Sequence, residues 1–402
     1  MAPIRHGFAR PLADPVLPTV DEVVADLRPS EPLVCLRPVA VADAAQRFVR
    51  SFPGDVLYAV KCNPEPRVLR ALWAGGVRHF DCASLGEVRL VRALLPQAAI
   101  HFMHPVKARP AIAEAFERWG VADFVLDSAD ELAKIVQETV PVGLVGDPPA
   151  LGLLVRLALP KGTAVYDLSG KFGAAADEAA RLLRAARPHA ARLGVSFHVG
   201  SQCLDPAAYA RAMALAAEIV AAAKVPVEIV DVGGGFPVSY PEMTPPPLAV
   251  YVDEIAAAAA ALPAGVRLWA EPGRGLVAAG GSVVAQVQLR RGNALYVNDG
   301  VYGNLSDAGA LGFRFPARRI RLGEAGAQDV QLADFTLFGP TCDSADQMKG
   351  PFRLPADMRE GDWIELGQLG AYGACLRTGF NGFGSSEPIE VADPPMLSTP
   401  GR

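Results

Sequence analysis

The sequence predicts an α/β protein in which a parallel (β/α)8 barrel of the TIM type is followed by an antiparallel β-sandwich or β-barrel domain. In residues 31–274, short apolar runs alternate with Ala-rich amphipathic stretches, which is the pattern of repeated β–α units. From residue 275 onward, strand-like runs are separated by Gly and Pro, without a long helical pattern between them. The 402 residues, of which 51% are hydrophobic, suffice for a barrel of about 250 residues and a second domain.

The barrel is predicted from eight apolar runs, each short enough to form one buried strand. Helical patterns lie between them, for example DEAARLLRAARPHAARL at 177–193. Eight runs favour a closed barrel over the alternative, a doubly wound open sheet. The predicted strands are VLYAV (56–60), VRHF (77–80), AAIHF (98–102), ADFVL (122–126), LLVRL (153–157), VSFHV (195–199), VEIVDV (227–232) and VRLWA (266–270).

The C-terminal domain, residues 275–402, is predicted to consist of antiparallel strands. Residues 1–30 are polar and rich in Pro, and we expect them to form an arm that joins this β domain. The predicted strands are SVVAQVQLR (282–290), ALYVND (294–299), ARRIRLG (317–323), DFTLFG (334–339) and DWIELG (362–367).

Composition and charge exclude several classes of function. A net charge of −5 without a basic run argues against nucleic-acid binding. No uncharged apolar segment reaches the about 18 residues of a membrane helix, and the N-terminus lacks the apolar core of a secretion signal. We therefore expect a cytoplasmic protein with no membrane partner. The cysteines form no metal-type pairs, which predicts free thiols and no metal site: they are Cys35, Cys62, Cys82, Cys203, Cys342 and Cys375.

Ionisable residues and glycines follow the predicted barrel strands at one end. Because the active sites of such barrels lie at the C-terminal ends of the strands, we expect these residues to share one site. They are Lys61, Asp81, Arg156, His198, the glycines Gly233 to Gly235, and Glu271.

Lys61 is the candidate nucleophile of this rim. Burial at the end of a strand lowers the pKa of a lysine and makes its amine available as a nucleophile. A lysine at such a position can also be a structural residue that extends into solvent, and for Lys61 considered alone this second interpretation is favoured.

A phosphate site is predicted beside it. Gly234 and Gly235 in GGGFP expose backbone N–H groups to an anion, and Arg274 and Ser201 add side-chain donors. These residues follow neighbouring strands, as in the usual phosphate site of a barrel. The alternatives are a simple tight turn for the glycines and an ion pair with Glu271 for Arg274.

Two loops of the β domain add candidates. Cys342 and Asp343 stand together in PTCDSAD, and a cysteine acts as an acid or nucleophile where its pKa is tuned. Tyr372 lies between glycines in GQLGAYG, which would let it approach a phosphate. A single cysteine in a loop is usually inert, and Tyr372 can equally be a tyrosine of a turn.

Taken in order, these motifs resemble a known family. YAVKCN, FDCASLGEV, KFG, HVGSQC, DVGGGFP, EPGR, YVNDGVYG, PTCDSAD, GAY and FNGF are similar to those of the alanine-racemase-fold (fold type III) decarboxylases that depend on pyridoxal 5′-phosphate (PLP). This family includes ornithine, lysine, biosynthetic arginine and diaminopimelate decarboxylases. The resemblance spans most of the chain, and the order and spacing of its motifs are specific.

The resemblance implies PLP as the cofactor and a role for each matching residue. Lys61 would carry PLP as a Schiff base, His198 would stack on its ring, Glu271 would pair with the pyridine nitrogen, and Cys342 would protonate the carbanion left by CO2. Asp81 and Glu87 would support Lys61. The remaining cofactor contacts would come from Arg156, Ser201, Gly234, Gly235, Arg274 and Tyr372.

The resemblance also implies a homodimer whose active sites are shared across the interface. Asp343 would bind the distal amine of a substrate in the partner subunit, and Phe380 would approach the partner's site. Tyr302 and Asp307 are further candidates for substrate binding.

The expected reaction is decarboxylation of a basic L-amino acid, L-ornithine to putrescine and CO2, as in polyamine biosynthesis. Cys342-Asp343-Ser344, in place of Cys-Glu-Ser, favours ornithine or lysine over diaminopimelate. However, Ala310-Leu311 stands where animal-type ornithine decarboxylases carry an acidic residue, and Asp307 is a possible substitute. The alternatives are a lysine or dual lysine/ornithine decarboxylase, a diaminopimelate decarboxylase, a racemase and a non-catalytic PLP-binding regulator.

Overall fold

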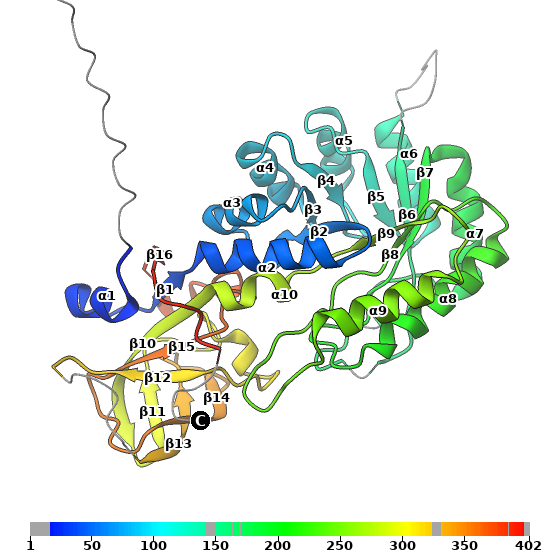
Figure 1. Cartoon of the computed structure of the whole chain (residues 1–402). Helices are drawn as coiled ribbons and strands as arrows, with labels where there is room; N and C mark the ends of the chain where they lie inside the picture. Colours follow the sequence, from blue (N-terminus) through cyan, green and yellow to red (C-terminus); the bar gives the residue numbers. More distant parts are fainter. Residues whose placement is uncertain are drawn as a thin grey trace, which may run out of the picture.

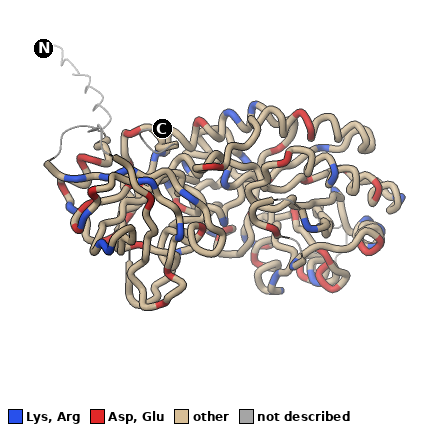
Figure 2. The backbone as a smooth tube through the Cα atoms, turned by 90° about the horizontal axis from the view of Figure 1, so that it is seen from below, with Lys and Arg blue, Asp and Glu red and all other residues tan. Residues whose placement is uncertain are grey.

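The chain forms a barrel and a β domain that lie side by side in the computed structural model (Figure 1). The structure describes residues 17–140, 150–162, 164–168, 170–323, 331–384 and 386–397. Basic and acidic residues are interspersed over both parts of the chain (Figure 2). None of the helices in the described ranges has the length and apolarity that crossing a bilayer requires.

The barrel is closed and consists of eight parallel strands, as predicted. Each strand pairs in parallel with the next, and the first pairs with the last. In a parallel barrel all C-terminal strand ends open on one rim, so residues after different strands meet there. The strands are β2 (Asp55–Ala59), β3 (His79–Cys82), β4 (Ala99–Phe102), β5 (Asp123–Leu126), β6 (Gly152–Arg156), β7 (Arg192–Ser196), β8 (Ile229–Asp231) and β9 (Arg267–Ala270).

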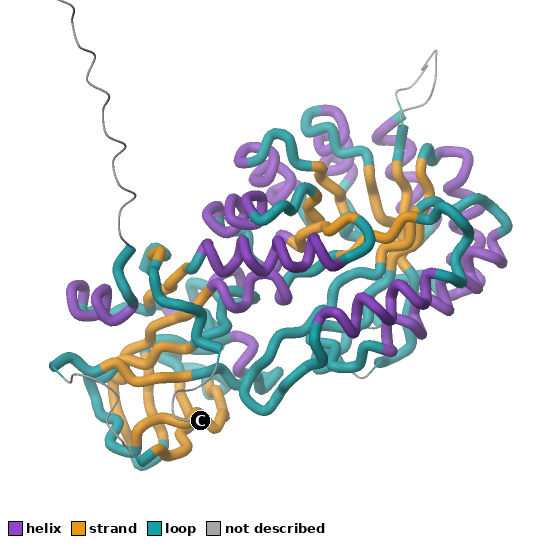
Figure 3. Tube along the Cα trace, viewed as in Figure 1, coloured by secondary structure: helices purple, strands orange, loops and turns teal. Residues whose placement is uncertain are grey.

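Helices surround the barrel strands (Figure 3). Two of them begin at serines that cap the helix, because Ser84 and Ser128 accept hydrogen bonds from the N–H groups of Glu87 and Glu131. The helices are α2 (Pro38–Ser51), α3 (Pro66–Ala74), α4 (Leu85–Leu94), α5 (Arg109–Glu117), α6 (Ala129–Thr139), α7 (Ala176–Ala186), α8 (Ala207–Ala223) and α9 (Leu248–Ala259).

The predicted helical pattern at 177–193 and the predicted strand at 195–199 were both wrong in their bounds. Helix α7 ends at Ala186, just before Pro188, which has no N–H to continue the helical hydrogen bonds. Strand β7 therefore begins at Arg192 and ends at Ser196. As a result, His198 lies in the loop that follows β7 and not in the strand itself.

The β domain is a mostly antiparallel sheet, as predicted, with parallel pairs only between β11 and β13 and between β1 and β16 among the described strands. The prediction missed β14, which contains Gly350 and Pro351 and so does not read as a strand. The strands are β1 (Leu33–Leu36), β10 (Gly281–Arg291), β11 (Ala294–Val297), β12 (Ala317–Ile320), β13 (Leu332–Phe338), β14 (Gln347–Pro355), β15 (Trp363–Leu366) and β16 (Ile389–Glu390).

The start of the chain contributes to the β domain. Strand β1 pairs antiparallel with β10, and the buried side chains of Val20 and Val24 in helix α1 (Val20–Leu27) pack against this sheet. The division of the chain at residues 30 and 274 stays a proposal, and the pairing of β1 argues for moving its first boundary to about residue 37.

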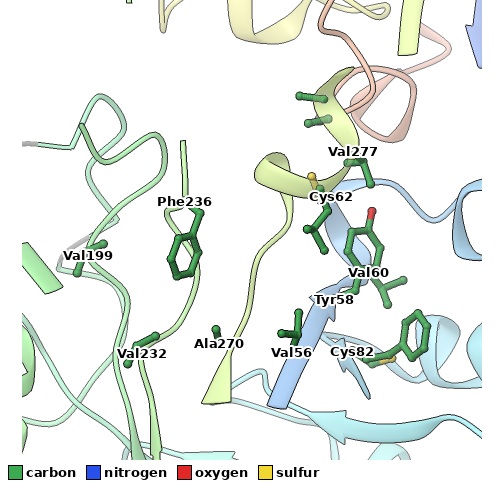
Figure 4. Close-up of a cluster of buried hydrophobic side chains, with 14 of the residues drawn as sticks. Val56, Tyr58, Val60, Cys62, Cys82, Val199, Val232, Phe236, Ala270 and Val277 are labelled. Atoms are coloured by element: carbon green, nitrogen blue, oxygen red, sulfur yellow. The ribbon is translucent and has the colours of Figure 1, made fainter. Parts of the chain in front are cut away.

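Apolar side chains form a continuous core that reaches the active-site end of the barrel. Figure 4 shows Val56, Tyr58, Val60 and Cys62 on β2 and the short 3-10 turn Val60–Cys62, with Phe236 across from them. Because Lys61 lies between two buried residues, Val60 and Cys62, this packing fixes the backbone that carries it.

Candidate active site

A cavity opens at the C-terminal rim of the barrel. Its walls come from the ends of β2 and β9 and from the loops after β7 and β8, with Tyr372 added from the β domain. The lining residues are Ala59, Lys61, His198, Ser201, Gly234, Gly235, Phe236, Glu271, Gly273, Arg274 and Tyr372. The structure thus brings most of the predicted cofactor residues together in one place.

Lys61 presents its amine to this cavity, and 44% of its side chain is exposed. Its Nζ donates a hydrogen bond of 2.8 Å to Oδ2 of Asp81, which is buried on β3. Glu87 lies nearby and accepts a hydrogen bond of 2.6 Å from the N–H of Ala83. This hydrogen bond to Asp81 therefore orients the amine of Lys61.

The expected lowering of the Lys61 pKa was wrong. Partial loss of hydration in the cavity acts to lower the pKa of Lys61, but the carboxylates of Asp81 and Glu271 outweigh it, and the pKa lies above its ordinary value. Lys107 shows the opposite case: burial lowers its pKa to about 8, but its side chain is inaccessible and hydrogen-bonds Val125 and His104. Access to the cavity, not the pKa, therefore distinguishes Lys61 as the candidate nucleophile.

His198 is held as a neutral ring. Its Nδ1 accepts a hydrogen bond of 3.0 Å from the N–H of Gly200, which leaves the proton on Nε2. Burial, followed by the positive charges of Arg156 and Lys61, keeps the pKa of His198 well below its usual value. A neutral aromatic ring on the cavity wall is suited to stack on a flat, electron-poor ligand.

Glu271 has a buried carboxyl whose Oε1 finds no hydrogen-bond partner among the described residues. Burial and the neighbouring carboxyls of Asp231 and Asp81 raise the pKa of Glu271 well above its ordinary value. The unpartnered, buried Oε1 of Glu271 is therefore available to a ring nitrogen of a ligand.

The glycines of GGGFP form a wall of the cavity that is too tightly packed for a side chain. Gly235 has a φ of +98°, and a Cβ there would lie 2.5 Å from the carbonyl oxygen of Gly200. A Cβ at Gly234 would lie 2.9 Å from Nε2 of His198. Ser201 lies on the same side, and its backbone exchanges two hydrogen bonds with Tyr166.

Arg274 and Tyr372 complete this side of the cavity. Nε of Arg274 is a buried donor without a partner among the described residues. The guanidinium carbon lies 5.0 Å from the ring centre of Tyr372, which occupies a left-handed backbone conformation with a φ of +52°. A strained residue and an orphaned donor on one wall indicate a site built for an anion.

The remaining predicted residues lie elsewhere on the same chain. Cys342 is exposed on the β domain, and its N–H donates a hydrogen bond of 3.0 Å to Oδ1 of Asn381. The hydroxyl of Tyr302 donates to Asp343, and the ring of Phe380 lies 4.9 Å from that of Tyr302. The cavity around Lys61 is not lined by Cys342, Tyr302, Asp343 or Phe380.

The prediction did not assign roles to Asp231, Tyr240 and Phe313. Asp231 opens the motif DVGGGFP and ends β8, so its place at a strand end was a usable signal. Tyr240 and Phe313 contact Arg274, but their positions in loops carry no such signal.

Asp231 should make the stability of the PLP-free protein depend on pH. Burial raises the pKa of Asp231 to about 6 from 3.8, so the folded protein loses stability as the pH rises through this interval. We expect Asp231→Asn to raise the free energy of unfolding at pH 8 by up to about 3 kcal/mol, and by much less near pH 4. Urea unfolding across this range measures the difference. The exposed Asp334→Asn serves as the control, and an equal effect of both variants would contradict the assignment.

The fold and the site define a barrel enzyme that holds an anionic, flat cofactor beside a reactive lysine. Residues 39–278 match the family model described as pyridoxal-dependent decarboxylase, pyridoxal binding domain. The chain belongs to this family, and PLP is its cofactor.

Individual relatives and a solved structure support the assignment. The chain is 31% identical to an ornithine decarboxylase of Panagrellus redivivus, with 92% of this chain and 87% of that protein covered. It is also 31% identical to antizyme inhibitor 2 of Xenopus laevis, with 87% and 78% covered. The crystal structure of a lysine/ornithine decarboxylase from Vibrio vulnificus, complexed with cadaverine, matches with a TM-score of 0.78 at 30% identity, with 93% and 98% covered.

The residues present fit PLP. Lys61 would hold its aldehyde carbon, Glu271 its ring nitrogen, and the wall of Gly234, Gly235 and Arg274 its phosphate. When bound, PLP supplies an electron sink for the electrons that a departing group leaves on the substrate.

Proposed function

We propose that this chain decarboxylates a basic L-amino acid, with L-ornithine as the preferred substrate and putrescine and CO2 as the products. The observation that carries the proposal is the cavity that Lys61, Glu271 and Arg274 line together, in which Oε1 of Glu271 and Nε of Arg274 have no partner among the described residues. This arrangement matches the three ends of PLP.

Each side chain has one task in this proposal. Lys61 would hold the cofactor, and Asp81 keeps the amine of Lys61 oriented. His198 would contact the face of the cofactor ring, and Glu271 would pair with the ring nitrogen. Cys342 then delivers one proton to Cα after CO2 has left.

The proposed enzyme is a homodimer that shares its active sites. Cys342 and Asp343 are on the β domain, outside the cavity that contains Lys61 of the same chain. A second copy would bring Cys342, Asp343 and Phe380 over this cavity, and a symmetric dimer would complete two sites at once. Asp343 would then pair with the distal amine of the substrate.

The six described cysteines are all free thiols, which supports a reducing compartment, and we propose the cytoplasm. The alternative, a non-catalytic PLP-binding regulator, is motivated by the relative named antizyme inhibitor 2. The presence of both Lys61 and Cys342 favours catalysis, and the Cys342-Asp343 pair favours a decarboxylase over a racemase.

The test is a comparison of kcat/KM for L-ornithine, L-lysine, L-arginine and diaminopimelate, with the products identified. We expect ornithine to be preferred over lysine by about tenfold, because one methylene is worth roughly 1–3 kcal/mol. Equal rates would establish the dual lysine/ornithine enzyme. Faster turnover of diaminopimelate, or a D-amino acid formed without CO2, would refute the proposal.

A further inference from the structure

A buried ion pair lies behind the cavity wall. Nη2 of Arg274 donates a hydrogen bond of 2.8 Å to Oδ2 of Asp307, and only 4% and 7% of the two side chains are exposed. Removing two charges from water is costly, and breaking such a pair leaves one charge buried without a partner. A pair at this position therefore calls for a role beyond stability.

The contacts of Arg274 leave one donor aimed at no other described residue. Nη1 donates a hydrogen bond of 2.9 Å to the hydroxyl of Tyr240, and Nη2 binds Asp307. Nε alone is buried and unpaired among the described residues. Because a guanidinium is planar and rigid, fixing both terminal nitrogens also fixes the direction of Nε.

The segment that carries Asp307 also covers the guanidinium with a ring. The carbonyl oxygen of Asp307 accepts a hydrogen bond of 2.9 Å from the N–H of Phe313, which closes the loop between them. The guanidinium carbon of Arg274 lies 4.8 Å from the ring centre of Phe313. The loop at 307–313 therefore holds Arg274 by charge and by stacking together.

We propose that Asp307 is a positioning residue that holds Arg274 toward the phosphate of PLP, and that it does not bind the distal amine of the substrate. The inference rests on the proposed function only for the identity of that amine. It assigns a task to Asp307 that differs from the expected one, because a carboxylate already paired with a buried arginine is not available to an ammonium group. Recognition of the amine would then depend on Asp343.

The test compares PLP with pyridoxal, which has the same ring and aldehyde but lacks the phosphate. We expect Asp307→Ala to weaken PLP binding to the PLP-free protein by about tenfold, or about 1.4 kcal/mol. Pyridoxal binding should change by less than about twofold, since it has no phosphate for Arg274 to contact. Asp307→Asn keeps an oxygen that accepts from Nη2 and should bind PLP within about threefold of the wild type.

Other outcomes would overturn the proposal. An equal loss for PLP and pyridoxal would indicate general damage to the fold. Unchanged PLP binding, with a loss of the preference for L-ornithine over L-norvaline, would make Asp307 an amine ligand. Binding is read from the absorbance of the cofactor, so the result stands even if the protein does not decarboxylate ornithine.

Two further variants serve as a second test and as a control. If Asp307→Ala does not fold, Tyr240→Phe removes the other fixed contact of Arg274 and should weaken PLP binding, but not pyridoxal binding, by about threefold. Asp334→Ala breaks an exposed ion pair with Arg353 in the β domain and should leave both affinities unchanged. Equal PLP affinities in Tyr240→Phe and the wild type would also contradict the proposal.

Discussion

Replacing Lys61 with alanine is expected to remove the covalent attachment of PLP and to lower kcat by at least about four orders of magnitude, or about 5 kcal/mol of barrier. Among the described residues that line the cavity, Lys61 alone carries an amine. Without it the substrate has no attached cofactor to exchange with, and Asp81 is left as a buried carboxylate without its partner. The visible absorbance of the bound cofactor and the release of CO2 measure the two effects.

Two other lysines give matched comparisons. Lys349 is exposed on β14, and its replacement by alanine should leave both readouts unchanged. Lys107 has the lower pKa, but its side chain is buried and hydrogen-bonded. Lys107→Met should therefore lower the stability of the protein and leave the absorbance of the bound cofactor unchanged. If the absorbance disappears in Lys107→Met and persists in Lys61→Ala, the attachment site has been assigned to the wrong lysine.

The sequence predicted the parts of the site that follow from the barrel itself. Arg156 ends β6, and Glu271 comes directly after β9, so both lie on the rim where every strand has its C-terminal end. Counting strands was sufficient here, because the closure of a parallel barrel brings together residues that are far apart in the chain. The glycines after β8 were found for the same reason.

The electrostatics could not be predicted in the same way. Burial alone suggested a lowered pKa for Lys61, but the sign depends on Asp81, whose carboxylate the fold brings to 2.8 Å. The pairing of Arg274 with Asp307 likewise joins residues from two domains, and no local pattern encodes it. Propensities and periodicity describe neighbours along the chain, whereas pKa values depend on neighbours in space.

Loops explain the other differences. The amphipathic pattern predicted a helix that continues past Pro188, but the helix ends before this proline. The strand that contains Gly350-Pro351 was not predicted, because Gly and Pro are unusual inside a strand. Neither error changed the predicted site residues, because His198 and Ser201 still follow the same barrel strand. A prediction of residues on a rim is thus more robust than a prediction of the bounds of the elements that carry them.

Cys342→Ala is expected to bind PLP normally and to lose clean amine production by about 10²–10⁴-fold, the usual contribution of a general acid. The cavity around Lys61 keeps its full lining in this variant, since Cys342 is exposed on the β domain. The absorbance of the cofactor should therefore match the wild type while putrescine formation falls. Unchanged turnover would refute the assigned role of this thiol.

Mixing the two inactive variants tests the shared site directly. If Lys61 and Cys342 of one active site belong to different subunits, a hybrid of Lys61→Ala and Cys342→Ala carries both defects in one site and an intact pair in the other. Random exchange of subunits would make half of the dimers hybrids, and the mixture should recover about 25% of the wild-type activity. If both residues of a site came from the same chain, each hybrid would contain two defective sites and no activity would return. The recovered activity therefore decides whether the exposed position of Cys342 in a single chain reflects a site completed by a partner.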